Sequence, residues 1–207
     1  VLARTYEEAQ KLYDKYSDNT LGVISDARFP LKSAAKAFGN EVMPEEKPKH
    51  RTDTFGREKC PDAGLQLFRY IRKNDPFVPL IIESSESENR AKAEAEGFRF
   101  VDKNSKKMSV DLRRLMEEHM GFGDFIFRDP KTHEEIMRIH SLKELQDNIF
   151  NIPNDSMLYH ISRNHMSRWL CARAIFPVSA FLKHVTWEKL QDVDAHRQII
   201  FDAIVQY

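Results

Sequence analysis

Three residues that could take part in phosphoryl chemistry each follow a short apolar run in the sequence. Asp26, Ser84 and Lys103 come directly after, or close to, the ends of these runs, which cover residues 21–25, 78–82 and 98–102. Each run is typical of a buried strand, and an open parallel sheet binds its ligands beyond the carboxyl ends of its strands. We therefore expect Asp26, Ser84 and Lys103 to converge on one edge of a sheet.

A carboxylate, a hydroxyl and an ammonium group at one edge could together handle a phosphoryl group. Phosphoryl transfer depends mainly on positioning and charge neutralisation, usually with Mg²⁺. Lys103 could supply a positive charge and Ser84 a hydroxyl donor to a phosphate held by Asp26. A single Asp after a strand more often caps a helix or forms a turn, so the prediction depends on the order of all three signals.

The order of Asp26, a proline four residues later (Pro30), Ser84 and Lys103 resembles the receiver domain of two-component response regulators. The resemblance covers residues 1–120 and implies an α/β, flavodoxin-like, doubly wound parallel sheet with strand order 2-1-3-4-5. It implies that Asp26 accepts the phosphoryl group, that Ser84 senses it and that Lys103 pairs with it. By the same resemblance, Phe100 is the switch aromatic, and Mg²⁺ binds to Asp26 and the backbone carbonyl of Arg28.

The sequence departs from the receiver pattern at three places. The acids of the first receiver strand have no counterpart, and we expect that strand upstream of Val1. Asn104 stands where the family usually has proline, and Ser85 where it usually has alanine. An alternative function is therefore a degenerate pseudo-receiver, a scaffold or docking domain without phosphorylation. A phosphatase that uses Asp26 as nucleophile is disfavoured, because the sequence from Asp26 to Arg28 lacks the Asp-x-Asp spacing of such enzymes.

Strand and helix patterns alternate up to about residue 120, which favours right-handed βαβ crossovers. Helices are expected at residues 6–16, 62–72, 85–97 and 110–120, and Val1 and Leu2 could end a strand. Residues 31–61 interrupt the pattern with many charges and two prolines. A long segment without periodicity predicts a mobile surface insertion, with a functional lid as the alternative.

Residues 121–207 read as a second, mostly α-helical domain with a small β-hairpin near residues 124–139. Further helices are expected from Ser141 to about 149, at 154–174, at 177–185, and from Thr186 to the last residue. On a continuous helix over 154–174, His160 and His165 lie on different faces. A spacing of five disfavours a metal site, so we expect His165 and Trp169 in a core. The side with His160, Arg163 and Arg173 would then be exposed and able to bind a partner or an anion.

Residues 124–170 are similar to a region of large bacterial proteins that carry a receiver-like segment before a part like pyruvate phosphate dikinase or phosphoenolpyruvate synthase. This resemblance implies that the chain is the N-terminal part of such a protein, with any ATP-dependent phosphotransferase (kinase) active site beyond Tyr207. No phosphate-binding glycine loop is present here, because the Gly121-x-Gly123 pair lacks a third glycine.

Composition limits the remaining classes of function. Lys+Arg and Asp+Glu are both 32, so the net charge is zero and no nucleic-acid partner is expected. No apolar run is long enough to span a membrane. Cys60 and Cys171 suit neither a disulfide framework nor a zinc site, which predicts a cytoplasmic location. The receiver resemblance implies a histidine kinase or small phosphodonor as partner, the rest of a larger polypeptide, and a possible homodimer.

Overall fold

The computed structural model describes residues 1–32 and 52–207 of the chain. They form two compact units, Val1–Asp111 (unit 1) and Leu112–Tyr207 (unit 2), and each is described by itself. The class is α/β, with a three-stranded parallel sheet and nine α-helices in the described residues. The sequence predicts a domain boundary near residue 120, just after helix α4 (Met108–His119), whereas the two units divide after Asp111, within that helix.

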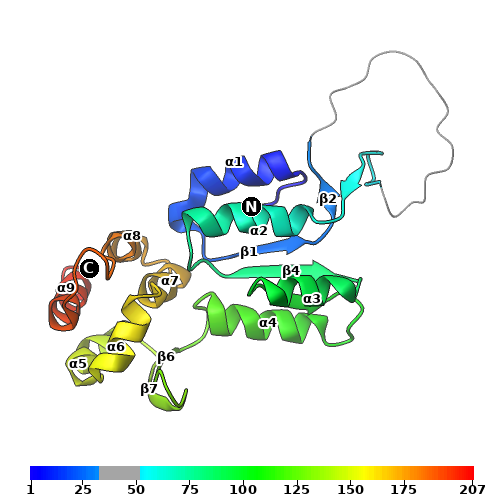
Figure 1. The fold of residues 1–207 in the computed structure, drawn as a ribbon. Coiled ribbons are helices and arrows are strands. Elements are labelled where there is room, and N and C mark those ends of the chain that lie inside the picture. The colour runs from blue at the N-terminus through cyan, green and yellow to red at the C-terminus, as the bar shows by residue number, and fades with distance from the viewer. Residues whose placement is uncertain (33–51) are drawn as a thin grey trace, which may run out of the picture. The chain divides into compact units, whose positions relative to one another are not determined.

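Unit 1 is built on a parallel sheet of strands β1 (Val23–Asp26), β4 (Leu80–Ser84) and β5 (Arg99–Asp102). Their order is β1-β4-β5, with β1 beside β4 in Figure 1. Asp26 is the register partner of Glu83, which in turn pairs with Val101. The three strands expected from the sequence are thus confirmed to within two residues at each end.

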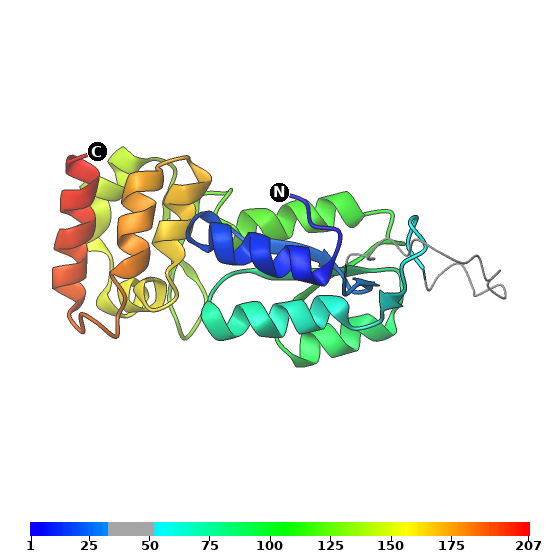
Figure 2. The same ribbon diagram turned by 90° about the horizontal axis from the view of Figure 1, so that it is seen from above.

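Helices α1 (Tyr6–Tyr16), α2 (Ala63–Asn74) and α3 (Glu88–Ala95) accompany this sheet. The hydroxyl of Thr5 accepts a hydrogen bond from the Glu8 amide and so caps α1. Helices α1 and α2 run side by side, as Figure 2 shows. Residues from all three helices and from the sheet form one buried cluster, which includes Tyr13, Leu67, Phe68, Ile71, Leu80, Ile82 and Ala93.

A small antiparallel pair follows the end of β1. Strand β2 (Phe29–Pro30) pairs with β3 (Lys59–Cys60), and Thr52 forms a bridge with Glu58. The sequence predicts only a mobile insertion over residues 31–61, so this pairing was missed, and residues 33–51 lie outside the described residues. The strand end expected at Val1 and Leu2 is wrong, because both residues are irregular and exposed.

After the remainder of α4, unit 2 continues with the expected hairpin, formed by β6 (Phe125–Arg128) and β7 (Glu135–Ile139). Five α-helices follow, namely α5 (Leu142–Asn148), α6 (Asn154–Ile161), α7 (His165–Ala172), α8 (Phe176–His184) and α9 (Val193–Val205). The hydroxyl of Ser141 accepts from the Glu144 amide, as the capping box predicts. Hairpin and helices share one core that includes Phe127, Leu145, Met157, Trp169, Leu170 and Ile200.

Two helix predictions in unit 2 are wrong. The single helix expected at 154–174 is broken between α6 and α7, where Asn164 adopts the left-handed conformation with φ 54°. The last helix begins at Val193 rather than after Thr186, because Asp192 caps it by accepting from the amides of Asp194 and Ala195.

The start of α2 packs directly on the end of β1. The Gly64 amide donates to the carbonyl oxygen of Ala27 at 3.0 Å. A Cβ at Gly64 would overlap the backbone oxygen of Asp26 and lie 2.9 Å from Cδ1 of Ile82. Only glycine therefore allows α2 to hold the loop after β1 in its observed position.

We predict that Gly64→Ala destabilises unit 1 by about 1–3 kcal/mol, because the added methyl group must displace backbone rather than a flexible side chain. Urea unfolding followed by circular dichroism measures the change. Lys73→Ala, at an exposed position of the same helix, is the control and should leave the free energy of unfolding within about 0.5 kcal/mol of the parent. Equal effects of the two variants would contradict the close approach.

Candidate functional site

Asp26 and Lys103 meet at the carboxyl edge of the parallel sheet, although 77 residues separate them. Nζ of Lys103 donates to Oδ1 of Asp26, and it lies 3.9 Å from Oε2 of Glu83. The side chain of Asp26 is 52 % exposed, that of Lys103 35 % and that of Glu83 17 %. The sequence prediction that Asp26 and Lys103 converge is confirmed, and Glu83 is a third member that it missed.

The register of the sheet explains this grouping. Asp26 and Glu83 are direct partners on neighbouring strands, and the Lys103 amide donates to the Ser84 carbonyl, which extends the ladder beyond β5. Side chains alternate between the two faces of a sheet, so register partners share a face. Asp26, Glu83 and Lys103 therefore project from the same face at three neighbouring strand ends.

Partial burial acts on both charged neighbours of Asp26. It raises the pKa of Glu83 and lowers the pKa of Lys103, because each charged form loses solvation. Two carboxylates share a single ammonium group here. The edge can therefore take up additional positive charge.

Asp26 also opens onto a cavity of about 650 Å³ beside β1. In the described part of the chain, β1 is an edge strand of the parallel sheet. The lining comes from α1, α2, β1, β4, the first residues of the chain and the turn before β1, and it includes Leu12, Tyr13, Leu21, Val23, Ile24, Leu67, Ile71 and Glu83. The wall is therefore mainly apolar, with the two carboxylates at the end where β1 finishes.

Ser84 is placed differently from the other two predicted residues. Its side chain is on the opposite face from Asp26, since it follows Glu83 in the strand. Its Oγ is buried and accepts hydrogen bonds from the Glu86 amide at 3.1 Å and from Nδ2 of Asn89 at 2.9 Å. The hydroxyl thus stabilises the beginning of α3 rather than contacting Asp26.

Phe100 and Arg28 complete the set of predicted residues. The ring of Phe100 is half-buried against the core of unit 1, and the guanidinium carbon of Arg90 lies 4.6 Å from its centroid. The sequence prediction assigns a role only to the backbone carbonyl of Arg28, as a magnesium ligand. Its side chain instead forms an ion pair with Glu86, 3.1 Å from Nη2 to Oε2.

The oxygen donors at this edge fit a magnesium ion only in part. No group of three or more His, Cys, Asp or Glu side chains that could hold a metal occurs in residues 1–32 or 52–207. Asp26, Glu83 and the Arg28 carbonyl are the oxygen donors available at the edge. Mg²⁺ takes oxygen ligands and keeps several waters, and one or two carboxylates often suffice, so these donors are compatible with it.

His160 and His165 of unit 2 are close together, in contrast to the prediction of separate faces. The break after α6 turns the chain so that Nδ1 of His160 lies 3.0 Å from Nδ1 of His165. His160 is buried beside Phe125 and Phe127, and its Nε2 has no hydrogen-bond partner in the described residues. The expectation of an exposed His160 that binds an anion is therefore wrong.

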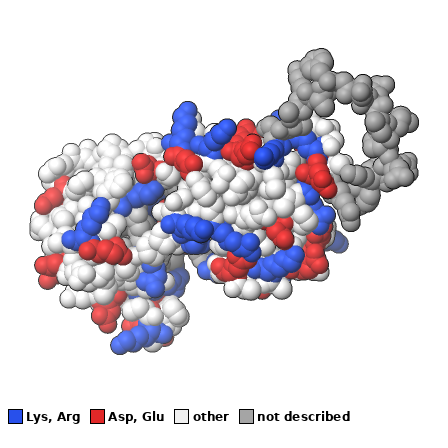
Figure 3. Space-filling model, turned by 45° about the horizontal axis from the view of Figure 1, so that its top comes forward, with Lys and Arg blue, Asp and Glu red and all other residues white. Residues whose placement is uncertain are grey.

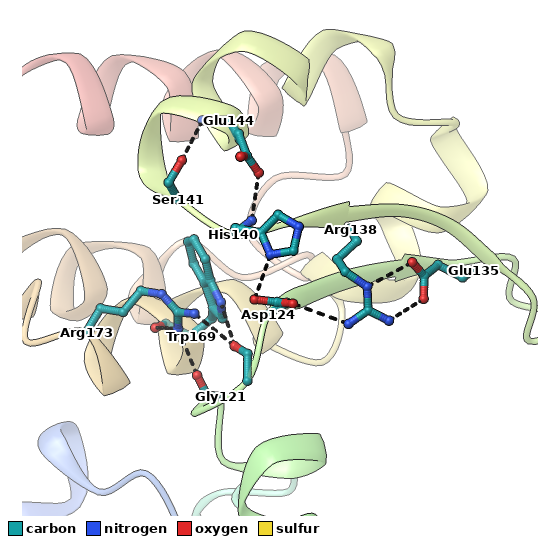
Figure 4. A network of polar contacts seen from close by, with 10 residues as sticks. Gly121, Asp124, Glu135, Arg138, His140, Ser141, Glu144, Trp169 and Arg173 are labelled. Atoms are coloured by element: carbon teal, nitrogen blue, oxygen red, sulfur yellow. Dashed lines mark hydrogen bonds and ion pairs between the residues drawn. The ribbon is translucent and has the colours of Figure 1, made fainter.

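Arg173, also expected on that exposed side, has a structural role, as Figure 4 shows. Its guanidinium donates to the carbonyls of Gly121 and Gly123, and its carbon lies 3.9 Å from the ring centroid of Trp169. Trp169 is buried and donates to the same Gly123 carbonyl at 3.1 Å. These contacts fix the turn that leads into the hairpin.

The interior of unit 2 keeps both histidines neutral. Burial lowers the pKa of His160 to about 4, assisted by the positive charges of Arg163 and Arg128. Burial also lowers the pKa of His165 to about 2, assisted by Arg168, His160, Arg163 and His119. No acidic group contributes to either shift, so a proton on this pair is not compensated.

Three further expectations can be compared with the structure. No disulfide joins Cys60 and Cys171. Within the part of the chain that is described, no helix combines the length and apolarity needed to cross a membrane. Figure 3 shows Lys and Arg side chains interspersed with Asp and Glu on the face in view. The absence of a nucleic-acid partner and the cytoplasmic location stay predictions.

Comparison with known proteins gives no relative: no family model, no curated protein and no solved structure matches the chain significantly.

The histidine pair predicts that unit 2 loses stability in acid. The folded-state pKa of each histidine lies below its unfolded value of about 6.5. The contribution of the neutral pair to the free energy of unfolding is therefore fully present above pH 6.5 and is lost as the pH falls. The lowered pKa of His165 alone should reduce the free energy of unfolding by about 3 kcal/mol at pH 4.5. Urea unfolding followed by tryptophan fluorescence measures this, because both tryptophans, Trp169 and Trp187, are in unit 2.

The variant His165→Asn should unfold with a shallower dependence on pH between 6.5 and 4.5. The control is His184→Asn, since His184 is exposed and should leave that dependence unchanged. A parent protein with constant stability over this pH range would contradict the role of the pair.

Proposed function

We propose that the chain is a regulatory receiver module that accepts a phosphoryl group on Asp26. The observation that carries this proposal is the contact between Asp26 and Lys103 at the carboxyl edge of a parallel sheet. Sequence order and spatial proximity agree at this point, since both residues lie at strand ends in the receiver-like order and their side chains are in contact. A half-exposed carboxylate beside an ammonium group is suited to an incoming phosphate.

The chemistry needs few groups. A carboxylate oxygen of Asp26 attacks the phosphorus of a small phosphodonor such as acetyl phosphate, the phosphorus–acetate oxygen bond breaks, and acetate leaves with the bond's electron pair. Lys103 neutralises charge on the phosphoryl oxygens as they approach Asp26. A histidine kinase could serve as donor in the same way, with its imidazole as the leaving group.

Magnesium would be held by Asp26 and the backbone carbonyl of Arg28, and Glu83 offers a further carboxylate. When bound, Mg²⁺ would supply charge neutralisation for the phosphoryl oxygens. Asp26 and Glu83 carry negative charge on a face where Lys103 is the neighbouring cation. This excess of negative charge supports the proposal of a cation.

The finer fold that we propose is the flavodoxin-like sheet of receivers. The order β1-β4-β5 equals the third, fourth and fifth strands of the order 2-1-3-4-5. In a longer polypeptide, the acid-bearing first strand would lie beside β1. The mainly apolar cavity along that edge, with Asp26 and Glu83 at its end, supports this placement. Unit 2 would then connect the receiver to a phosphoenolpyruvate synthase-like part. We also propose that two copies of the protein form a homodimer.

A pseudo-receiver scaffold is the second candidate, and the placement of Ser84 favours it. The hydroxyl that would sense the phosphate is on the opposite face from Asp26, and to reach a phosphate there its Oγ would have to leave the two donors that it accepts from at the start of α3. In a scaffold of this kind, the Asp26–Lys103 contact serves only to join β1 to β5. The two candidates differ in whether Asp26 reacts with a phosphodonor.

We predict that incubation with acetyl phosphate and Mg²⁺ adds one phosphoryl group, ~80 Da in intact mass, to the protein. The matched control Asp26→Asn removes the nucleophilic oxygen and should show no addition. Circular dichroism confirms that both proteins are folded. A folded parent that gains no mass would exclude the phosphoacceptor function under these conditions and leave the scaffold as the better proposal.

A further inference from the structure

An ion pair bridges the strand ends next to Asp26. Arg28, two residues after Asp26, contacts Glu86, two residues after the end of β4. Nη2 of Arg28 lies 3.1 Å from Oε2 of Glu86, and the side chains are 26 % and 40 % exposed. The pair thus joins the loop that carries the acceptor carboxylate to the loop that begins α3.

Arg28 has donor capacity that this pair does not use. Its Nε is buried and has no hydrogen-bond partner in the described residues. A guanidinium group presents its donors as a rigid planar fork, which binds two oxygens of a phosphate at once. Within the ion pair, the hydrogen bond from Nη2 to Glu86 satisfies only part of that fork.

Arg28 lies in the loop directly after β1, two residues beyond Asp26. Ala27, between them, is buried in the core cluster, and its amide donates to the Glu83 carbonyl at 3.0 Å, which continues the strand ladder. Strand β1 ends at Asp26, and the chain bends at Ala27 and Arg28. The guanidinium therefore branches from the short loop that directly follows the carboxylate that would be phosphorylated.

Glu86 also belongs to the network that holds Ser84. Its amide donates to Ser84 Oγ, and Nδ2 of Asn89 contacts both Ser84 Oγ at 2.9 Å and Glu86 Oε2 at 3.3 Å. Any movement of the Glu86 carboxylate thus acts on the first turn of α3. Arg28 and Ser84 are connected through this one acidic residue.

We propose that Arg28 is a phosphoryl ligand held in reserve by Glu86: when Asp26 is phosphorylated, the guanidinium exchanges the Glu86 carboxylate for the phosphoryl oxygens. This inference rests on the proposed function and adds its regulation. A phosphoryl group carries nearly two negative charges and three acceptor oxygens, against one charge on a partly exposed, screened carboxylate. The exchange releases Glu86, and the release reaches Ser84 and α3 through Asn89.

The test compares the rates at which four proteins are phosphorylated by acetyl phosphate with Mg²⁺: the parent, Arg28→Gln, Glu86→Gln and the double variant. Arg28→Gln should lower the second-order rate constant roughly tenfold or more, because a charge-assisted contact to the phosphoryl group is lost. Arg28→Lys should restore part of it by returning the charge. Glu86→Gln should raise the rate constant about two- to fivefold by freeing the guanidinium.

The double variant separates this role from a merely structural one. If Glu86 acts only by restraining Arg28, the acceleration caused by Glu86→Gln disappears in the Arg28→Gln background. Persistence of that acceleration, or an unchanged rate for Arg28→Gln, overturns the exchange while leaving the phosphoacceptor function intact. If the parent itself gains no phosphoryl group, both proposals fail together. Should Arg28→Gln not fold, the Arg28→Lys and Glu86→Gln proteins carry the comparison.

Discussion

The parallel register of β1, β4 and β5 is the constraint on which the candidate site depends. A shift of one residue between β1 and β4 would turn Asp26 or Glu83 to the other face, because side chains alternate with a period of two. Buried side chains fix that register on both faces. Ile82 belongs to the helix-covered core, and Ile81, on the opposite face, is fully buried as well. The apolar packing of the strand centres thus determines which charged groups meet at the strand ends.

The same register separates two residues that the sequence treats alike. Ser84 and Lys103 both follow apolar runs, but Lys103 lies on the face of Asp26 and Ser84 on the face covered by helices. The resulting contacts differ accordingly: an ion pair with Asp26 for Lys103 and two hydrogen bonds at α3 for Ser84. A pattern of strand ends predicts proximity to an edge, whereas the face depends on a register that spans distant parts of the chain.

Local signals made much of the fold predictable. Helix α1 has Thr5 as a cap and acidic residues in its first turn, and the capping box at Ser141 forms as expected. Elements without a local signal were missed. Strands β2 and β3 have two residues each, too few to show a period. The break at Asn164 also has no breaker such as proline, and it is held by tertiary contacts, including the hydrogen bond between His160 and His165.

Basic residues show most clearly what the sequence does not predict, since a Lys or Arg in a sequence is normally expected to be a solvated surface charge. Arg173 instead donates to two loop carbonyls, and Arg197, only 2 % exposed, donates to the carbonyls of Ile149 and Ile152. Each orders backbone that has no partner within its own helix or strand. Arg28 differs from both, because its partner is a single carboxylate near the surface and its Nε is unused.

An arginine that satisfies buried carbonyls cannot leave them without a large cost, whereas one paired with a half-exposed carboxylate can. For Ser84, the free energies of its present hydrogen bonds and of a hydrogen bond to a phosphate are closer to each other. Contact with a phosphate would replace two neutral hydrogen bonds, worth about 1 kcal/mol each, by one charge-assisted bond of about 1.5–3 kcal/mol. The two terms nearly cancel, so the hydroxyl by itself gives little bias towards a switched state. A charge exchange at Arg28 would tip that balance, because it removes from Glu86 the cation that helps to hold the first turn of α3 in place.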